Sequence, residues 1–303
     1  MLKGNEVIIK RSASLWEYWE INYVNIKNVS LSIINSGLTF GGPLLPFDTL
    51  LFYISLRERL LIAAAMARSH YLAVNYNGKE LNVYHHSQQP LEHTHPLRCS
   101  PLRIGLISYD FNDHPSARLI EGIFRFTKQY KDKNSKATEC EWYNLLKIYV
   151  YSYGKNDNSM YRWVLENLSD KFHDLASLSH EQSASLIVND QIDVLLEMQL
   201  HTLGNRLEIT ATKPCQIIVN YLVYPGTSGA TFIDYLFADF MVVPVEHVQF
   251  YSESLIYVQP SYQISYYEDN DTLFSKIKPI NHDSISTDQT LWTLMEIKTD
   301  LRR

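Results

Sequence analysis

The chain has 303 residues, of which 46% are hydrophobic and 13% aromatic, a composition typical of one large globular domain or two ordinary ones. A net charge of -6 at pH 7 and scattered Lys and Arg side chains argue against nucleic acid as a partner. The cysteines Cys99, Cys140 and Cys215 lie far apart without Cys-x-x-Cys spacing. This spacing argues against a disulfide framework and a zinc site, and it favours a reducing compartment.

The sequence contains no pattern of a secretory leader, because the charges between Lys3 and Arg11 are not followed by an apolar run. The longest apolar stretches, near 60–67 and 217–223, are shorter than the roughly 20 residues of a membrane span. We therefore expect a soluble, intracellular protein with no membrane partner.

Residues 1–77 are expected to be mostly helical. In "SLRERLLIAAAMARSHYL" a set of apolar side chains follows helical spacing, namely Leu56, Leu60, Ala63, Ala64 and Ala67. A further helix is expected between Ser14 and Leu38, with an apolar face of Trp16, Trp19, Ile26 and Val29. Residues 78–101 are rich in Asn, His, Ser, Gln and Pro, which predicts a linker.

Residues 102–270 are expected to alternate strands with helices. The strand candidates, in chain order, are "LRIGLIS", "LLKIYVYS", "IDVLLEMQ", "CQIIVNYLVY", "LFADFMVVP" and "SLIYVQ". One helix is expected from Ser116 to Phe126, and another in "SHEQSASLIVND", where Ser179 and Gln182 have capping-box spacing. Alternating units of this kind predict a parallel sheet covered by helices, the α/β class.

Ligands of open parallel sheets bind outside the carboxyl ends of the strands, and one polar loop is expected there. In "SYDFNDHPSARLI" the residues Asp110 to His114 follow a strand, and Pro115 takes the first helical position, where its missing N–H costs nothing. His114 would then be the N-cap beside free helix N–H groups, a place for a phosphate or a sugar. The alternative is that these residues are only a helix cap and a turn.

A second loop, "YPGTSG" from Tyr224 to Gly229, is expected at the same edge. Gly226 and Gly229 permit positive φ and close approach of the backbone to a ligand. An ordinary strand-to-helix turn is the alternative.

A third loop, "MQLHTLGNR", is predicted on the same rim and contains His201, Thr202, Asn205 and Arg206. Solvated loop residues are the alternative for this His and Arg. No P-loop, G-x-G-x-x-G, H-E-x-x-H or G-x-S-x-G motif is present.

Taken in order, the DFxxHP and YPGTSG elements and their flanking strands resemble the protein O-linked N-acetylglucosamine transferases and the related SPINDLY-type O-fucosyltransferases. The resemblance covers roughly residues 40–265. It implies a GT-B architecture, in which two Rossmann-like lobes enclose a cleft and follow tetratricopeptide repeats. The chain would hold the end of that helical region and the N-terminal catalytic lobe. Residues 271–303 would begin the inter-lobe region, and the second lobe, with most nucleotide contacts, would be missing.

The resemblance also implies roles for individual residues. His114 corresponds to a histidine described as a catalytic base or active-site contact, and Asp110 to the aspartate of the same loop. Residues near the sugar and the acceptor would be Pro115, Ser116, Leu222, Tyr224, Pro225, Gly226 and Thr227. The reaction would be inverting transfer of GlcNAc from UDP-GlcNAc to Ser or Thr of intracellular proteins, without a cofactor or an essential metal. A histidine with an ordinary pKa of about 6.5 suits the removal of the acceptor proton.

The chain departs from the family pattern at four positions. Val223 and Leu200 stand where glycine is usual, and Phe47 and Asp48 stand where animal enzymes carry two histidines. Two alternatives remain open. One is a SPINDLY-type fucosyltransferase, because the resemblance implies that donor choice depends largely on the missing lobe; the other is a non-catalytic binding or scaffold protein, which the two lost glycines would fit.

Overall fold

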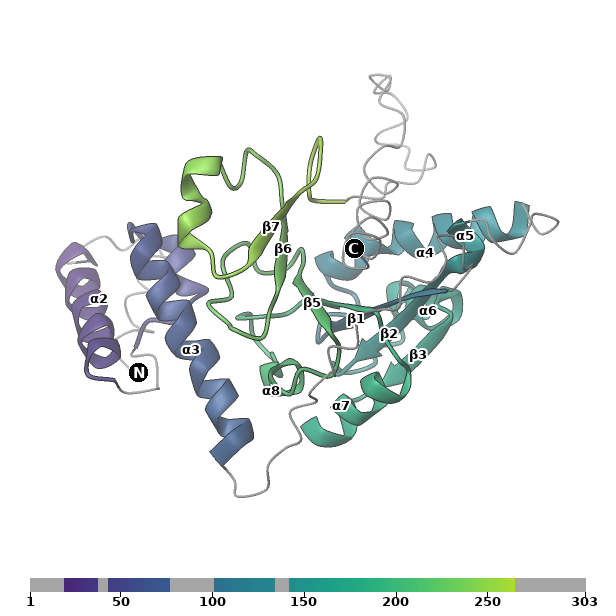
Figure 1. Cartoon of the computed structure of the whole chain (residues 1–303), viewed down its shortest axis with the longest axis horizontal. Helices are drawn as coiled ribbons and strands as arrows, with labels where there is room; N and C mark the ends of the chain where they lie inside the picture. The colour runs from purple at the N-terminus through teal and green to yellow at the C-terminus, as the bar shows by residue number, and fades with distance from the viewer. Residues whose placement is uncertain (1–18, 38–42, 77–100, 134–141, 265–303) are drawn as a thin grey trace, which may run out of the picture.

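The structure is a computed structural model that describes residues 19–37, 43–76, 101–133 and 142–264 (Figure 1). The expected linker at 78–101, apart from Pro101, and the expected inter-lobe region at 271–303 lie outside the described residues, as do Trp16, Cys99 and Cys140.

A seven-stranded sheet forms the centre of the molecule, and every strand pair in it is parallel. The strands are β1 (Leu102–Ser108), β2 (Leu146–Ser152), β3 (Lys171–Asp174), β4 (Val194–Glu197), β5 (Ile217–Asn220), β6 (Tyr235–Ala238) and β7 (Ser254–Tyr257). Their order is β3-β2-β1-β4-β5-β6-β7. The first six follow the order of the doubly wound Rossmann sheet, with the reversal of strand order between β1 and β4. The α/β prediction is confirmed.

The sequence analysis predicted six of these strands and missed β3. This strand lies at the edge of the sheet, and its four residues are Lys, Phe, His and Asp, none of them fully buried. An edge strand with charged ends lacks the buried apolar run that marks the other strands.

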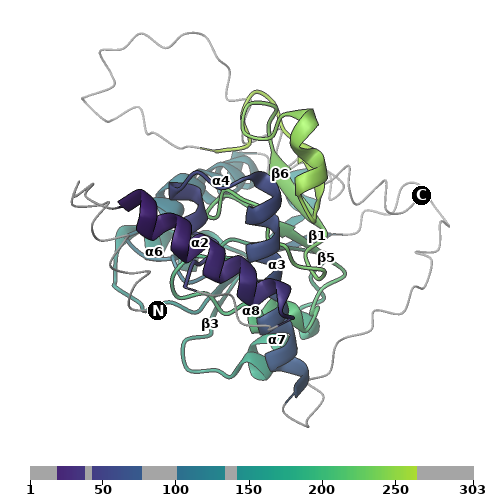
Figure 2. The same cartoon turned by 90° about the vertical axis from the view of Figure 1, so that its left-hand side faces the viewer.

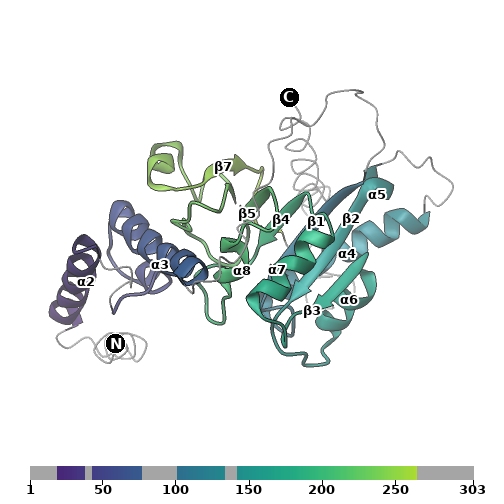
Figure 3. The same ribbon diagram turned by 60° about the horizontal axis from the view of Figure 1, so that its bottom comes forward.

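Helices cover both faces of the sheet (Figure 3). The helices are α2 (Trp19–Asn35), α3 (Leu56–Tyr76), α4 (Pro115–Lys133), α5 (Trp142–Leu145), α6 (Met160–Leu168), α7 (His180–Asn189) and α8 (Leu207–Ala211), with 3₁₀ turns η1 (Asp48–Leu51) and η2 (Val245–Phe250). On one face Ile104 and Leu106 pack with α4 and α6, and on the other Ile107 packs with α3, α7 and α8. The alternation follows from the two-residue period of a strand.

The helical segment before the sheet is part of the same core. Ala67 and Val74 of α3 belong to the apolar cluster of the sheet's second face. Gly229 lies so close to α3 that a Cβ there would sit 2.2 Å from the backbone nitrogen of Ala64. Tertiary contacts thus join α3 to the sheet.

Helix α2 lies across α3 (Figure 2) and packs through Tyr23 and Ile26, which form an apolar cluster with Ile62. The prediction that Val29 belongs to the apolar face is wrong, because its side chain is 50% exposed. The packed face follows positions 23, 26 and 30, where buried Ser30 accepts a hydrogen bond from the Leu44 N–H. None of the described helices is long and apolar enough to cross a membrane.

Candidate functional site

Three polar loops meet at the carboxyl edge of the sheet. They follow β1, β4 and β5, which are neighbours in the sheet. The first two loops flank the reversal of strand order between β1 and β4, the position at which doubly wound sheets bind ligands. The structure therefore brings the three loops predicted from the sequence to one rim.

The loop after β1 presents a histidine at the start of α4. Pro115 is the first residue of α4, as predicted, and His114 precedes it. The imidazole Nδ1 lies 2.9 Å from Ser116 Oγ, 3.3 Å from the Ser116 N and 3.7 Å from Asp110 Oδ2. The His114 side chain is 41% exposed, and Nε2 makes no hydrogen bond to a described residue. Two tautomers are compatible with these contacts. In one, Nδ1 accepts the hydrogen bond of the Ser116 N–H and Nε2 carries the proton; in the other, Nδ1–H donates to Ser116 Oγ and the Nε2 lone pair is available to act as a general base.

Gln199, which follows β4, fixes the orientation of Asp110. Its Oε1 accepts hydrogen bonds from Ser108 Oγ at 2.7 Å and from the Tyr109 N–H at 3.1 Å. Its Nε2 donates to Asp110 Oδ2 at 3.0 Å and to the Leu203 carbonyl at 2.9 Å. Gln199 is 1% exposed, and Asp110 is 13% exposed. Both polar atoms of the Gln199 amide are therefore hydrogen-bonded: Oε1 anchors the side chain to the end of β1, and Nε2 holds Asp110 beside His114.

The loop after β5 is held from beneath by a buried carboxylate. Glu253 is 4% exposed and accepts hydrogen bonds from Thr227 Oγ1 at 2.7 Å and from the Ser228 N–H at 2.6 Å. Asn220 Nδ2 donates to the Gly226 carbonyl at 3.0 Å. Sequence reasoning missed Glu253, whose role depends on contacts 25 and 26 residues away along the chain.

The residues predicted to lie near the sugar in the loop after β5 are partly buried and partly on the surface. Leu222, Tyr224 and Thr227 are buried, whereas Pro225 is exposed and Gly226 partly so. A Cβ on Gly226 would lie 3.0 Å from the ring of Tyr224, a tight contact that the ring could accept only by shifting.

Gly229 has φ +64°, the left-handed conformation that glycine favours, as expected. The alternative of a strand-to-helix turn is wrong, because β6 follows this loop without an intervening helix.

The loop after β4 connects the other two loops. His201 is 7% exposed, its Nε2–H donates to the Ser228 carbonyl at 2.7 Å, and its ring meets the ring of Tyr224 edge-on. Burial lowers the pKa of His201 to about 4, so the ring is neutral at pH 7. The alternative of solvated residues is wrong for His201. It is also wrong for Arg206, whose guanidinium donates to the carbonyls of Leu175 and Leu178.

The departures from glycine have different structural consequences. Leu200 has φ +46°, a backbone conformation that glycine favours, but its side chain is buried. Val223 packs against the apolar cluster on the α4 side of the sheet. Phe47 is 42% exposed, and Asp48 accepts a hydrogen bond from the Leu45 N–H at 3.2 Å. Within the described residues, no group of three or more His, Cys, Asp or Glu side chains could hold a metal ion.

Fold and site together define an α/β protein with a histidine-containing polar site at the switch point of a doubly wound sheet. The chain belongs to glycosyl transferase family 41, whose family model matches residues 42–293.

Curated relatives match part of the chain. It is 32% identical over 184 residues to the probable UDP-N-acetylglucosamine–peptide N-acetylglucosaminyltransferase SEC of Arabidopsis thaliana, with 60% of this chain and 17% of that protein covered. It is 30% identical over 223 residues to the UDP-N-acetylglucosamine–peptide N-acetylglucosaminyltransferase of Caenorhabditis elegans, with 72% and 18% covered. The chain thus spans less than a fifth of the length of these relatives.

A solved structure has a similar fold. The O-GlcNAc transferase of Thermobaculum terrenum, solved as a mutant, superimposes with a TM-score of 0.56 at 21% identity. The superposition covers 86% of this chain and 42% of the bacterial chain. At this identity the likeness concerns the fold alone.

Proposed function

We propose that the chain forms the N-terminal catalytic lobe of a protein O-GlcNAc transferase of the cytoplasm or nucleus, which transfers N-acetylglucosamine from UDP-GlcNAc to Ser or Thr of protein acceptors. One observation carries the proposal. The loop after β4 hydrogen-bonds to the aspartate of the histidine loop through Gln199 and to the YPGTSG loop through His201. The two loops that distinguish the family are therefore held in one arrangement at the ligand-binding edge of the sheet.

In the proposed reaction His114 is the general base. Its exposed Nε2 accepts the proton of the acceptor hydroxyl while the hydroxyl oxygen attacks the anomeric carbon, the bond to the UDP leaving group breaks, and the configuration inverts. Asp110 Oδ2, 3.7 Å from Nδ1, stabilises the imidazolium that forms. A positioned base of this kind contributes about 10²–10⁴-fold to a rate.

The neighbouring residues would surround the sugar and the acceptor. Pro115 is exposed beside His114, and Ser116 Oγ fixes the imidazole through Nδ1. Pro225 and Gly226 would contact the sugar from the surface of their loop, with Leu222, Tyr224 and Thr227 as buried supports. A second lobe of the family's architecture would supply the diphosphate contacts.

A transfer assay tests the proposal. The polypeptide of the complete reading frame that contains these residues is incubated with a Ser-containing acceptor protein and either UDP-GlcNAc or GDP-fucose. We expect mass spectrometry to detect added GlcNAc only with UDP-GlcNAc. Transfer from GDP-fucose alone would assign the SPINDLY-type activity, and no transfer from either donor would support a binding or scaffold role.

A further inference from the structure

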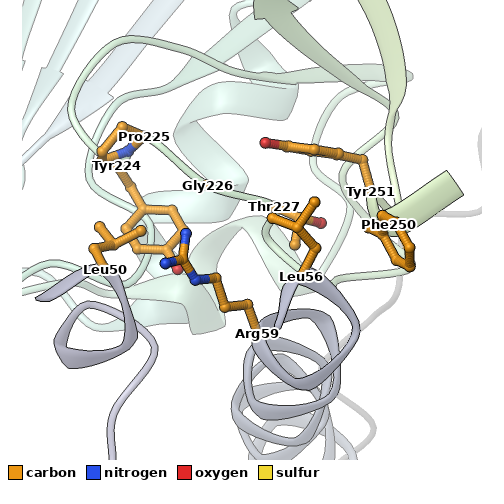
Figure 4. A pocket seen from close by; sticks show the side chains of 9 residues that line it. All are labelled: Leu50, Leu56, Arg59, Tyr224, Pro225, Gly226, Thr227, Phe250 and Tyr251. Carbon is orange, nitrogen blue, oxygen red and sulfur yellow. The ribbon is translucent and has the colours of Figure 1, made fainter. Parts of the chain in front are cut away.

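A small pocket lies behind the YPGTSG loop, on the side of the helical segment. Figure 4 shows its walls, which come from η1, the first turn of α3, the loop itself and the end of η2. Its volume is about 30 Å³. A single water molecule needs about 10–15 Å³ on this measure, so the pocket fits a small head group and excludes a sugar ring.

Arg59 of α3 is the cation among the residues that line this pocket. Its Nε is buried without a hydrogen-bond partner among the described residues, and its Nη2 donates a long hydrogen bond of 3.4 Å to the Phe52 carbonyl. Arg59 makes no ion pair within the part of the chain that the structure describes. Arg59 is partly exposed, so only the buried Nε–H lacks an acceptor, and a buried donor without an acceptor is costly.

Glu58, the neighbour of Arg59 in α3, and Glu253, which acts with Arg59 on the pKa of Tyr224 and Tyr251, are already occupied. Glu58 pairs with Lys27 at 3.2 Å and caps α3 through Ser55. Glu253 accepts hydrogen bonds from the loop beneath which it lies. Neither carboxylate is therefore free to turn toward the pocket and neutralise Arg59.

Two tyrosine hydroxyls supply further donors. Tyr224 and Tyr251 line the pocket, and neither hydroxyl makes a hydrogen bond to a described residue. Burial raises the pKa of both phenols, so both remain O–H donors at neutral pH. In Figure 4 the guanidinium of Arg59 extends from α3 to the side of the Tyr224 ring, and the hydroxyl of Tyr251 lies across the trace of the loop from it in this view.

We propose that this pocket binds an oxyanion head group, a carboxylate or a phosphate, which accepts hydrogen bonds from Arg59, Tyr224 and Tyr251. A guanidinium with a free buried N–H and two hydroxyls without partners among the described residues match an anion better than a cation. Arginine is the side chain best suited to such groups because its N–H fork fits two oxygens at once. The pocket shares the YPGTSG loop with the proposed sugar site. Anion binding is measured without a sugar donor or an acceptor, so the transfer assay and the test of anion binding can fail independently.

Thermal unfolding of the full chain in increasing phosphate or acetate, against chloride at matched ionic strength, tests the proposal. A bound anion raises the midpoint in a saturable way that yields a dissociation constant. We expect saturation with at least one anion, and the stronger one identifies phosphate or carboxylate. We expect Arg59→Gln to weaken binding by about tenfold or more, the loss of a charge-assisted hydrogen bond. Arg57→Gln, an exposed arginine of the same helix, is the matched control and should bind as wild type.

Tyr251→Phe keeps the ring and removes one hydrogen-bond donor, so it should weaken anion binding about fivefold. If Arg59→Gln does not fold, Tyr251→Phe takes its place in the comparison with the wild type. No saturable effect in the wild type, or equal affinity in wild type, Arg59→Gln and Tyr251→Phe, would mean that water alone fills the pocket and would overturn the proposal.

Discussion

The loops after β1 and β5 differ in how they are built. The first presents His114 with 41% of its side chain exposed, above an aspartate that a buried glutamine fixes. The second buries Tyr224 and Thr227 and rests on the buried carboxylate of Glu253. The first loop exposes a titratable side chain, whereas the second loop is fixed by buried contacts.

Mutations in these two loops should therefore have different consequences. A change at the tip of the first loop removes chemistry but few buried contacts, so it should alter rate with little loss of stability. A change beneath the second loop leaves buried donors without acceptors, so it should alter stability first. The loop after β4 is shared by the other two, because Gln199 hydrogen-bonds to Asp110 of the first loop and His201 to the Ser228 carbonyl of the second.

The largest expected effect is that of His114→Ala on transfer. In the complete polypeptide we expect kcat to fall by about 10²–10⁴-fold, because the acceptor proton loses its base. The unfolding midpoint should stay near that of the wild type, since the side chain is partly exposed. Steady-state transfer kinetics and thermal unfolding measure the two quantities.

The control for this prediction is Asp113→Asn in the same loop. Asp113 pairs with Arg118 at 2.6 Å on the surface, and about half of each side chain is exposed. This variant should keep wild-type turnover. Wild-type turnover in His114→Ala would remove His114 from the mechanism.

In contrast to His114→Ala, Glu253→Ala should mainly lower the stability of the fold. It leaves the Ser228 N–H and Thr227 Oγ1 without their acceptor and opens a cavity, at a cost of about 4 kcal/mol in the free energy of unfolding. Urea unfolding of the 303-residue chain measures this loss without any assay of activity. Exposed Glu246→Ala on η2 is the matched control and should lose little. Equal stabilities of the two variants would show that the carboxylate does not hold the loop.

Much of the sheet could be predicted from the sequence because its inner strands are apolar runs that alternate with helical patterns. Six strands and the capping box of Ser179 and Gln182 were predicted, and the structure contains them. Pro115 marked the start of α4 because proline fits the first helical position. These signals are local, and they lie within one element.

The supports of the site could not be predicted because they depend on distant contacts. Gln199 meets Asp110 across 89 residues, and its position just after β4 becomes informative only once β4 is known to lie beside β1. His201 was open to a solvated interpretation because nothing local shows that Tyr224 covers it. The positive φ of Leu200 could not be predicted from the sequence either, because leucine rarely adopts a positive φ.

The smallest predicted effect concerns Glu197, which lies at the end of β4 beneath the shared loop. Its Oε1 accepts hydrogen bonds from the N–H groups of Gln199 and Leu200 at 3.1 and 3.2 Å. Burial raises its pKa from 4.5 to about 7. Between these pH values the folded state binds more protons than the unfolded state, so the stability that Glu197 contributes falls as pH rises.

Glu197→Gln keeps the accepting oxygen and cannot ionise. Its stability relative to wild type should therefore increase from pH 4.5 to pH 7, by at most about 3 kcal/mol. His201 acts in the opposite direction, because its lowered pKa makes the fold lose stability as pH falls from 6.5 toward 4. It is present in both proteins, so its contribution cancels in the difference. Urea unfolding of both proteins across this pH range measures the difference, and a value independent of pH would show that Glu197 is ionised throughout, held by the two N–H donors of the shared loop.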